Sequence, residues 1–197
     1  MIDWTIMGRS VSHYTARGFE YVEVPWIVDQ RYSMLTAPSG TSNIQVSGFV
    51  NNPSINNDYF VASAEQAFIQ MMDNKQLVKD KFYQTVSPCL RDDVVDKLHQ
   101  TQFMKNELFL FTDDEEHANW CLQKMVVNAR MLFKQFVSAD DISLEDIDDP
   151  WALVQTDINI KGIEVGSYGI RKIGFMFIVF GTGIALPRFT IAMLEKI

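Results

Sequence analysis

A charged connection separates two stretches of the chain that are typical of β-strands. The segment FYQTVSPCLRDDVVDKLHQTQFMKNELFLF, from Phe82 to Phe111, has flanks rich in aromatic and branched residues, which predict two strands. The connection of about ten residues is longer than a hairpin needs, and such loops often carry function. It holds Arg91, Asp93 and His99. The guanidinium fork of Arg91 could bind a carboxylate or phosphate at two oxygens, and an ordinary surface charge is the alternative.

Two carboxylates come from a second predicted hairpin, in which LVQTDINI precedes and IEVGSYGIR follows the turn Lys161–Gly162. With that turn, Asp157 faces Gly166, and Asp157 and Glu164 lie on the same face of the sheet, about 7–8 Å apart. Two carboxylates at this spacing can share a divalent cation, and few hard oxygen ligands suit Mg²⁺ carried in by a nucleotide. A solvated polar face is the alternative.

Two further features could contact a ligand. The stretch GTGIALPR places glycines before a predicted helix whose first turn carries Arg188. Helix N-termini favour anions, and glycine allows a ligand to approach the backbone. Phe103 begins the return strand of the first hairpin, where it could belong to the core or offer a face to a flat base.

The elements that position these residues follow from periodicity and from turn residues. The first 18 residues are predicted to form a helix that ends at Gly18, and Phe19–Val24 alternates as a strand. Residues 36–58 predict a long surface loop with a short hairpin around IQVSGFV. The capping box SAEQ, residues 63–66, predicts a helix that continues to about Lys79.

A long helix is predicted from about Glu115 to Val137, because apolar residues recur there at steps of four and three. The apolar run Ile173–Leu186 predicts a buried strand or strand pair, and a helix follows from about Pro187. Neighbouring hairpins with helices between them predict an α+β fold, an antiparallel sheet flanked by helices. The helical stripe, which we interpret as core packing rather than a cofactor-binding surface, consists of Ala118, Leu122, Met125, Ala129, Leu132 and Phe136.

The length predicts one domain of ordinary size, or at most two small ones, and we interpret residues 1–197 as a single domain. Apolar residues make up 47% of the chain, enough for a substantial core. The net charge is −8, and the acidic runs at residues 113–116 and 139–149 predict solvated surface or loop. This excess of negative charge disfavours DNA as a partner, because a surface that binds nucleic acid needs lysine and arginine side chains clustered on one face.

Neither a disulfide nor a metal motif is predicted from the cysteines and histidines. Cys89 and Cys121 are far apart, so we interpret them as reduced thiols in a reducing, cytoplasmic compartment. The three histidines lack any zinc-binding spacing. The chain does not begin with a signal-peptide pattern, and its most apolar run has 14 residues where a membrane span needs about 20. We therefore expect no association with a membrane.

Taken in order, these segments resemble the catalytic core of class II aminoacyl-tRNA synthetases over nearly the whole chain. GFEYVEVPWI is similar to the first motif, which forms the dimer interface of that family. LRDD followed by HQTQF is similar to the second motif, and GTGIALPRFTIAML to the third. SAEQ resembles the Thr/Ser-x-Glu element before the second motif. IEVGSYGIR is especially similar to a segment of aspartyl-tRNA synthetases and asparagine synthetase A.

This resemblance implies a homodimeric enzyme that uses ATP and Mg²⁺ to activate an amino acid as an aminoacyl-adenylate. It implies that Arg91 holds the α-phosphate and the substrate carboxylate, and that Phe103 stacks on adenine. It also implies that His99 lies near the phosphates and that Arg188 takes the γ-phosphate. Asp93 stands where a glutamate is usual, one methylene shorter.

The resemblance also implies roles at the metal and the amino acid. Asp157 and Glu164 match the magnesium-binding carboxylates, in agreement with the hairpin geometry. Glu65 is expected to meet the amino group of the substrate. Arg171 matches the arginine that recognises the side-chain carboxylate in the aspartate-using enzymes.

The chain departs from the family pattern at several positions. Gln102 replaces a glutamate, and Pro187 replaces an acidic or small polar residue. Phe68 stands where the aspartate-using enzymes have a lysine, and an aromatic ring at this place in the substrate pocket is expected to suit an apolar or mixed side chain. No segment remains for an anticodon-binding domain, so the acceptor is expected to be ammonia, a carrier protein or a small molecule; tRNA is possible but not favoured. The alternative is a non-catalytic paralogue that acts as a binding or regulatory subunit.

Overall fold

One large sheet organises the protein in the computed structural model, which describes residues 1–36, 43–46 and 58–195. Within these residues the sheet has seven strands in the order β1-β4-β5-β9-β8-β7-β6. β1 runs parallel to β4, and every other neighbouring pair is antiparallel. The strands are β1 Glu20–Tyr21, β4 Tyr83–Leu90, β5 Gln102–Thr112, β6 Ile142–Asp146, β7 Val154–Ile160, β8 Ile163–Ile173 and β9 Met176–Leu186.

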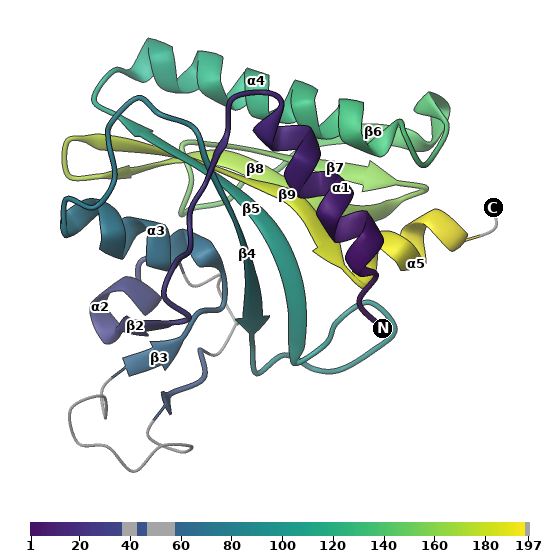
Figure 1. Ribbon diagram of the computed structural model, residues 1–197, viewed down its shortest axis with the longest axis horizontal. Coiled ribbons are helices and arrows are strands. Elements are labelled where there is room, and N and C mark those ends of the chain that lie inside the picture. The colour runs from purple at the N-terminus through teal and green to yellow at the C-terminus, as the bar shows by residue number, and fades with distance from the viewer. Residues whose placement is uncertain (37–42, 47–57, 196–197) are drawn as a thin grey trace.

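Helices cover both faces of this sheet (Figure 1), which confirms the predicted α+β fold. The first and fourth helices pack on one face, and the third helix packs on the other beside the small pair of strands β2 and β3. These elements are α1 Trp4–Thr15, β2 Ile27–Asp29, α2 Gln30–Ser33, β3 Asp58–Phe60, α3 Ala64–Asp73, α4 Glu115–Phe133, a short 3₁₀ helix Ala139–Asp141 and α5 Arg188–Leu194.

Alternation along β5 separates the two cores. Leu108 and Leu110 point toward α1 and α4, whereas Phe109 and Phe111 point toward α3. All of these side chains are buried, because successive residues of a strand face opposite sides of the sheet. The predicted stripe of α4 is confirmed as core packing: Ala118, Leu122, Met125, Ala129 and Leu132 are buried against the sheet, and Phe136, which lies beyond the helix, packs against them.

Two predicted elements are shorter in the structure. The helix that begins after Ser63 ends at Asp73 rather than near residue 79, because the chain turns at Lys75, which has a φ of 58°. The strand predicted over Phe19–Val24 pairs only as β1, and after Val22 donates one more hydrogen bond to β4 the chain leaves the sheet. The hairpin predicted around IQVSGFV falls largely outside the described residues.

The acidic run at residues 139–149 is mostly exposed, as predicted, yet it is not simply a loop. It contains β6, which forms the outer edge of the sheet beside β7. Charged side chains on an edge strand discourage pairing with a further chain. The predicted α1 and α5 are confirmed, with Gly18 at a φ of 86° after the first and Pro187 capping the second.

A β-bulge changes the predicted register of the β7–β8 hairpin. The turn is as predicted, but Asp157 faces Ser167 instead of Gly166, because Val165 is an extra residue on β8. Val165 and Tyr168 are both buried on the α4 side. Residues three apart in a regular strand face opposite sides of the sheet, so these two can share a face only because a bulge lies between them. The bulge therefore turns Ser167 and the residues at alternate positions after it toward the opposite face.

Two glycines of GTGIALPR have a packing role in the core. A β-carbon at Gly181 would lie 2.6 Å from the ring of Tyr168, and one at Gly183 would lie 2.8 Å from the ring of Tyr14. Both tyrosines are fully buried in the core between the sheet and its helices, Tyr168 on β8 and Tyr14 on α1. These two glycines thus make room for large aromatic rings, and Gly181 also lines the cavity described below, so the expectation that a ligand approaches the backbone here stays a prediction.

Cys89 and Cys121 are free and buried, so neither forms a disulfide. In the described part of the chain, no helix combines the length and the apolar composition that crossing a bilayer requires.

Candidate active site

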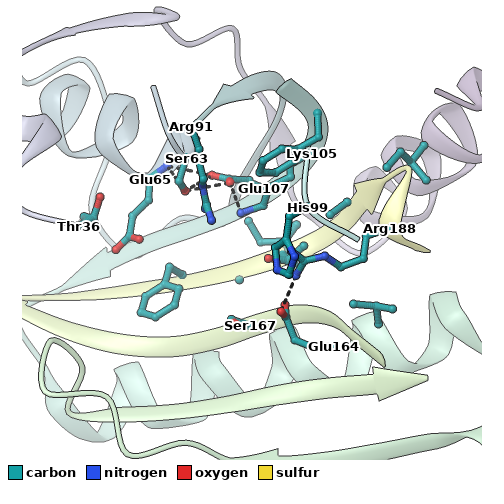
Figure 2. Close-up of a pocket in the computed structure, with 18 of the residues that line it drawn as sticks. Thr36, Ser63, Glu65, Arg91, His99, Lys105, Glu107, Glu164, Ser167 and Arg188 are labelled. Atoms are coloured by element: carbon teal, nitrogen blue, oxygen red, sulfur yellow. Dashed lines mark hydrogen bonds and ion pairs between the residues drawn. The ribbon is translucent and has the colours of Figure 1, made fainter. Parts of the chain in front are cut away.

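A cavity of about 250 Å³ opens on the α3 side of the sheet. Its floor is formed by β5, β8 and β9, and its rim by the 91–101 loop and the starts of α3 and α5. Figure 2 shows side chains from these elements pointing toward one another across the cavity. Every sequence-predicted site residue except Asp157 lines it: Glu65, Arg91, Asp93, His99, Phe103, Glu164, Arg171 and Arg188.

Arg91 and Phe103 face each other where β4 ends and β5 begins. The guanidinium carbon of Arg91 lies 5.3 Å from the ring centre of Phe103, a cation–π arrangement. The Nε of Arg91 donates to the carbonyl of Ala62 at 3.0 Å, which fixes the side chain against the start of α3. The two residues predicted to hold a phosphate and a base are therefore brought together.

An aspartate organises the loop that carries His99. The carboxylate of Asp96 accepts hydrogen bonds from the backbone nitrogens of Leu98 and His99 at 2.7 Å, and it lies 2.9 Å from Nδ1 of His99. These hydrogen bonds lower the pKa of Asp96 to about 2, and the bond with the His99 ring contributes most. The loop is thus held in a shape that presents His99 and Asp93 to the cavity.

Arg188 and Glu164 form an ion pair across the cavity (Figure 2). Nη1 of Arg188 lies 2.5 Å from Oε2 of Glu164, and its Nε lies 3.4 Å from the carbonyl of Leu98. The side chains are 23% and 40% exposed, so a ligand in the cavity can reach both. The residues assigned to a phosphate and a metal ion are thus paired with each other.

Asp157 lies behind Ser167 and does not line the cavity. Its carboxylate accepts a hydrogen bond from the hydroxyl of Ser167 at 2.6 Å, and burial raises its pKa. Among the described residues, no three His, Cys, Asp or Glu side chains cluster closely enough to hold a metal ion. Asp157 and Glu164 are hard oxygen donors that suit Mg²⁺, but they need further ligands, such as the phosphates of a nucleotide.

Glu65 and Arg171 form a buried ion pair at the other end of the cavity. Nε of Arg171 lies 3.0 Å from Oε1 of Glu65, and the two side chains are 11% and 8% exposed. Burial raises the pKa of Glu65, although the neighbouring Arg171 opposes this shift. Two of the three residues predicted to bind the amino acid therefore pair with each other, while the third, Arg91, lies elsewhere in the cavity lining.

Sequence reasoning missed a second buried network, built on Glu107. Its carboxylate accepts hydrogen bonds from the hydroxyl of Ser63 at 2.8 and 2.9 Å and from the backbone nitrogen of Glu65 at 3.0 Å. Lys105 pairs with it at 2.5 Å. Alternation along β5 places Lys105 and Glu107 on the same face as Phe103, and that spacing was the available signal. Beside this network, burial raises the pKa of the Cys89 thiol to about 12.

Phe68 is not part of the cavity. It is fully buried and stacks on Phe109, with ring centres 4.7 Å apart. The expectation that an aromatic ring at this position shapes the substrate pocket is therefore wrong. Gln102, another departure from the family pattern, is exposed at the start of β5.

No protein-family profile matches the chain, and no curated protein matches it by sequence. Solved structures do match. The ATP complex of seryl-tRNA synthetase from Pyrococcus horikoshii has a TM-score of 0.79 and 20% identity, over 98% of this chain and 50% of that one. The AMP complex of cytoplasmic serine-tRNA ligase from Naegleria fowleri has a TM-score of 0.73 and 15% identity, over 96% of this chain and 47% of that one.

A pyrrolysyl-tRNA synthetase from Desulfitobacterium hafniense matches with a TM-score of 0.69 and 12% identity, over 98% of this chain and 73% of that one. The chain therefore has the fold of class II aminoacyl-tRNA synthetase catalytic domains. It spans about half the length of the seryl-tRNA synthetases that it matches. These neighbours are seryl and pyrrolysyl enzymes, so they support the class of fold but not the aspartate-using subgroup within it.

Proposed function

We propose that this protein binds ATP with Mg²⁺ and activates an amino acid as an aminoacyl-adenylate. The observation that carries the proposal is the meeting of Arg91, Phe103, Arg188, Glu164 and Glu65 in one cavity, although they come from distant parts of the chain. In the reaction, an oxygen of the substrate carboxylate bonds to the α-phosphorus, the bond from that phosphorus to its bridging oxygen breaks, and pyrophosphate leaves.

The nucleotide would be bound by the 91–103 hairpin and by α5. Adenine would stack on Phe103, since every base offers a flat face to an aromatic ring. Arg91 would contact the α-phosphate and the substrate carboxylate together, which holds the reacting groups in line. Arg188 would take the γ-phosphate, with His99 and Asp93 beside the phosphates. Catalysis would then come from positioning and from neutralised charge.

Glu164 and Asp157 would hold Mg²⁺ together with phosphate oxygens. The ion would supply positive charge that offsets the charge of the leaving pyrophosphate. Glu164 faces the cavity directly, whereas Asp157 also supports the hydroxyl of Ser167. At the other end, the free edge of Glu65 would meet the amino group of the substrate.

We also propose a homodimer built on the segment that resembles the first motif. Trp4, Tyr21 and Trp26 belong to this part of the chain and are 61%, 43% and 58% exposed. Large aromatic side chains left in water favour a covered surface. Light scattering at micromolar concentration should give a dimer, and a monomer would contradict this part of the proposal.

The acceptor of the activated amino acid can be tRNA, ammonia, a carrier protein or a small molecule. A second candidate function is a binding or regulatory subunit without turnover, which the Arg188–Glu164 pair and the shorter Asp93 favour. ATP–pyrophosphate exchange with each of the twenty amino acids tests activation without knowledge of the acceptor. Exchange with one class of amino acid supports the enzyme, whereas ATP binding without any exchange supports the second candidate.

A further inference from the structure

The inner end of the cavity carries charged side chains that pair with each other and leave a small negative excess. Two cations, Arg171 and Lys105, lie among three carboxylates, Glu65, Asp149 and Glu107. The group therefore keeps one negative charge, which matches the single ammonium that every amino-acid substrate brings. The substrate carboxylate would be met by Arg91, which has no acidic partner among the described residues.

All three nitrogens of the Arg171 guanidinium face oxygens of the protein. Nε donates to Glu65 at 3.0 Å, Nη1 donates to the carbonyl of Trp151 at 2.7 Å, and Nη2 lies 3.8 Å from Asp149. One flat face of the group covers the ring of Phe180, 4.7 Å from its centre. Nε and Nη1 are therefore hydrogen-bonded to the protein, and a substrate carboxylate would reach Arg171 only at the side of Nη2, where it would meet the like charge of Asp149.

Glu107 is engaged in the same way. Its two oxygens receive the hydroxyl of Ser63, the backbone nitrogen of Glu65 and the ammonium of Lys105, and the residue is 3% exposed. A cationic substrate side chain would have to displace Lys105 or add a second positive charge beside it. Either arrangement is costly, because uncompensated charges in a buried site lose their hydration.

Thr36 lies at this end of the cavity and carries a buried hydroxyl. It lines the cavity, is 5% exposed, and its hydroxyl makes no hydrogen bond within the described part of the chain. Figure 2 shows it on the same side of the cavity as Glu65. A buried hydroxyl without a hydrogen bond is unfavourable, so a ligand that supplies the missing partner gains affinity.

We propose that this end of the cavity selects an amino acid whose side chain is uncharged and carries a hydrogen-bonding group, and that Thr36 is the residue that determines this specificity. The inference rests on the proposed function for the kind of substrate, but it concerns binding rather than turnover. Acidic side chains are disfavoured because Glu65 and Asp149 already lie beside Arg171, and basic side chains are disfavoured because Lys105 already pairs with Glu107. Apolar side chains are disfavoured because they leave the Thr36 hydroxyl unpaired.

Calorimetry of amino-acid binding tests the selectivity directly. We expect uncharged polar amino acids to bind at least about a hundredfold more tightly than aspartate, glutamate, lysine or arginine, given the cost of an unpaired buried charge. Thr36→Val, which keeps the shape and removes the hydroxyl, should weaken their binding about fivefold to tenfold and leave apolar amino acids unaffected. Thr5→Val, an exposed threonine of α1, is the matched control and should change neither.

A second variant should shift the selectivity in the opposite direction. Asp149→Asn removes one of the two carboxylates beside Arg171, so acidic amino acids should gain about threefold in affinity relative to uncharged ones. Asp148→Asn, at the exposed neighbouring position, is the control and should not change the ratio.

The outcomes separate the two proposals. Tight binding of an acidic, basic or apolar amino acid, or an unchanged preference in Thr36→Val, overturns the specificity proposal even where pyrophosphate exchange is observed. Selective binding of uncharged polar amino acids without any exchange supports the specificity proposal and contradicts activation. No binding of any amino acid to the protein with ATP and Mg²⁺ overturns both.

Discussion

The guanidinium of Arg188 lies 2.5 Å from the carboxylate of Glu164, so two residues with expected roles at the phosphates and the metal hold each other. The pair has a consequence for nucleotide binding. A cation that binds Glu164 competes with Arg188 and sets the arginine free for a phosphate, so Mg²⁺ and ATP should bind more tightly together than separately.

Glu164→Gln should weaken this dependence on magnesium. The amide has no charge with which to retain Arg188, so we expect ATP binding without Mg²⁺ to strengthen about fivefold, while the gain on adding Mg²⁺ becomes smaller. Calorimetry with ATP in EDTA and in Mg²⁺ measures both effects. Glu116→Gln, on the exposed side of α4, is the control. Weaker binding of metal-free ATP to Glu164→Gln would argue against the coupling.

Phe103→Ala should weaken the binding of ATP by about 1–3 kcal/mol, because the adenine loses its stacking surface. The change also removes the ring that faces the Arg91 guanidinium at 5.3 Å, so part of the loss reflects a less ordered arginine. Phe103→Leu separates the two effects only partly, so the control is Phe175→Ala at the 90% exposed tip between β8 and β9. Unchanged ATP affinity in a folded Phe103→Ala protein would reject the stacking role.

Arg171→Met should destabilise the fold by about 3 kcal/mol, because Glu65 and Asp149 lose their common cation in a buried setting. Glu65→Gln combined with Arg171→Met should recover part of that loss, since the amide leaves no unpaired charge at Glu65. Urea denaturation measures the free energy of unfolding of each protein. Arg31→Met, which breaks an exposed pair, should cost less than about 0.5 kcal/mol.

Asp157→Asn should raise the melting temperature near neutral pH. Burial raises the pKa of Asp157 in the folded protein above its ordinary value of 3.8, so its ionised form opposes folding at neutral pH. As the pH falls through the raised pKa, the Asp157 carboxyl of the folded protein binds a proton before that of the unfolded protein does. The wild-type protein therefore gains stability until the pH reaches about 3.8, the ordinary pKa of the group. The advantage of the asparagine variant should therefore shrink in acid.

Scanning calorimetry from pH 7 to pH 4 measures this change for Asp157→Asn. The asparagine oxygen can still accept the Ser167 hydroxyl, so packing is kept. Asp148→Asn, an exposed substitution, is the control and should show no such trend. A gain that stays constant over this range would mean that the Asp157 carboxyl does not titrate as its burial implies.

Local pattern was enough to predict the hairpins and helices that position the site. The apolar spacing of α4, the Ser63 cap and the Lys161–Gly162 turn are all local signals, and each is found in the structure. The placement of Arg91 and Phe103 at facing strand ends follows from the same reasoning, because β4 and β5 pair in the expected order.

Long-range contacts could not be predicted in this way. The bulge at Val165 depends on packing against residues that are distant in the sequence. The predicted partner of Asp157, Gly166, was therefore one position away from the observed partner, Ser167. The Glu107 network joins α3 to β5 through Ser63, and no local pattern reports such a partner. The resemblance assigned Phe68 to the substrate pocket, whereas in the structure its side chain is buried in the core and stacks on Phe109.

The central claim is that this cavity forms an aminoacyl-adenylate, and ATP–pyrophosphate exchange tests it most directly. With Mg²⁺ and a panel of twenty amino acids, we predict exchange that depends on an uncharged polar amino acid. Arg91→Gln should reduce it by at least about a hundredfold, since that side chain would contact both reacting groups. Exchange that is absent for every amino acid, or that is unaffected in Arg91→Gln, would contradict the account.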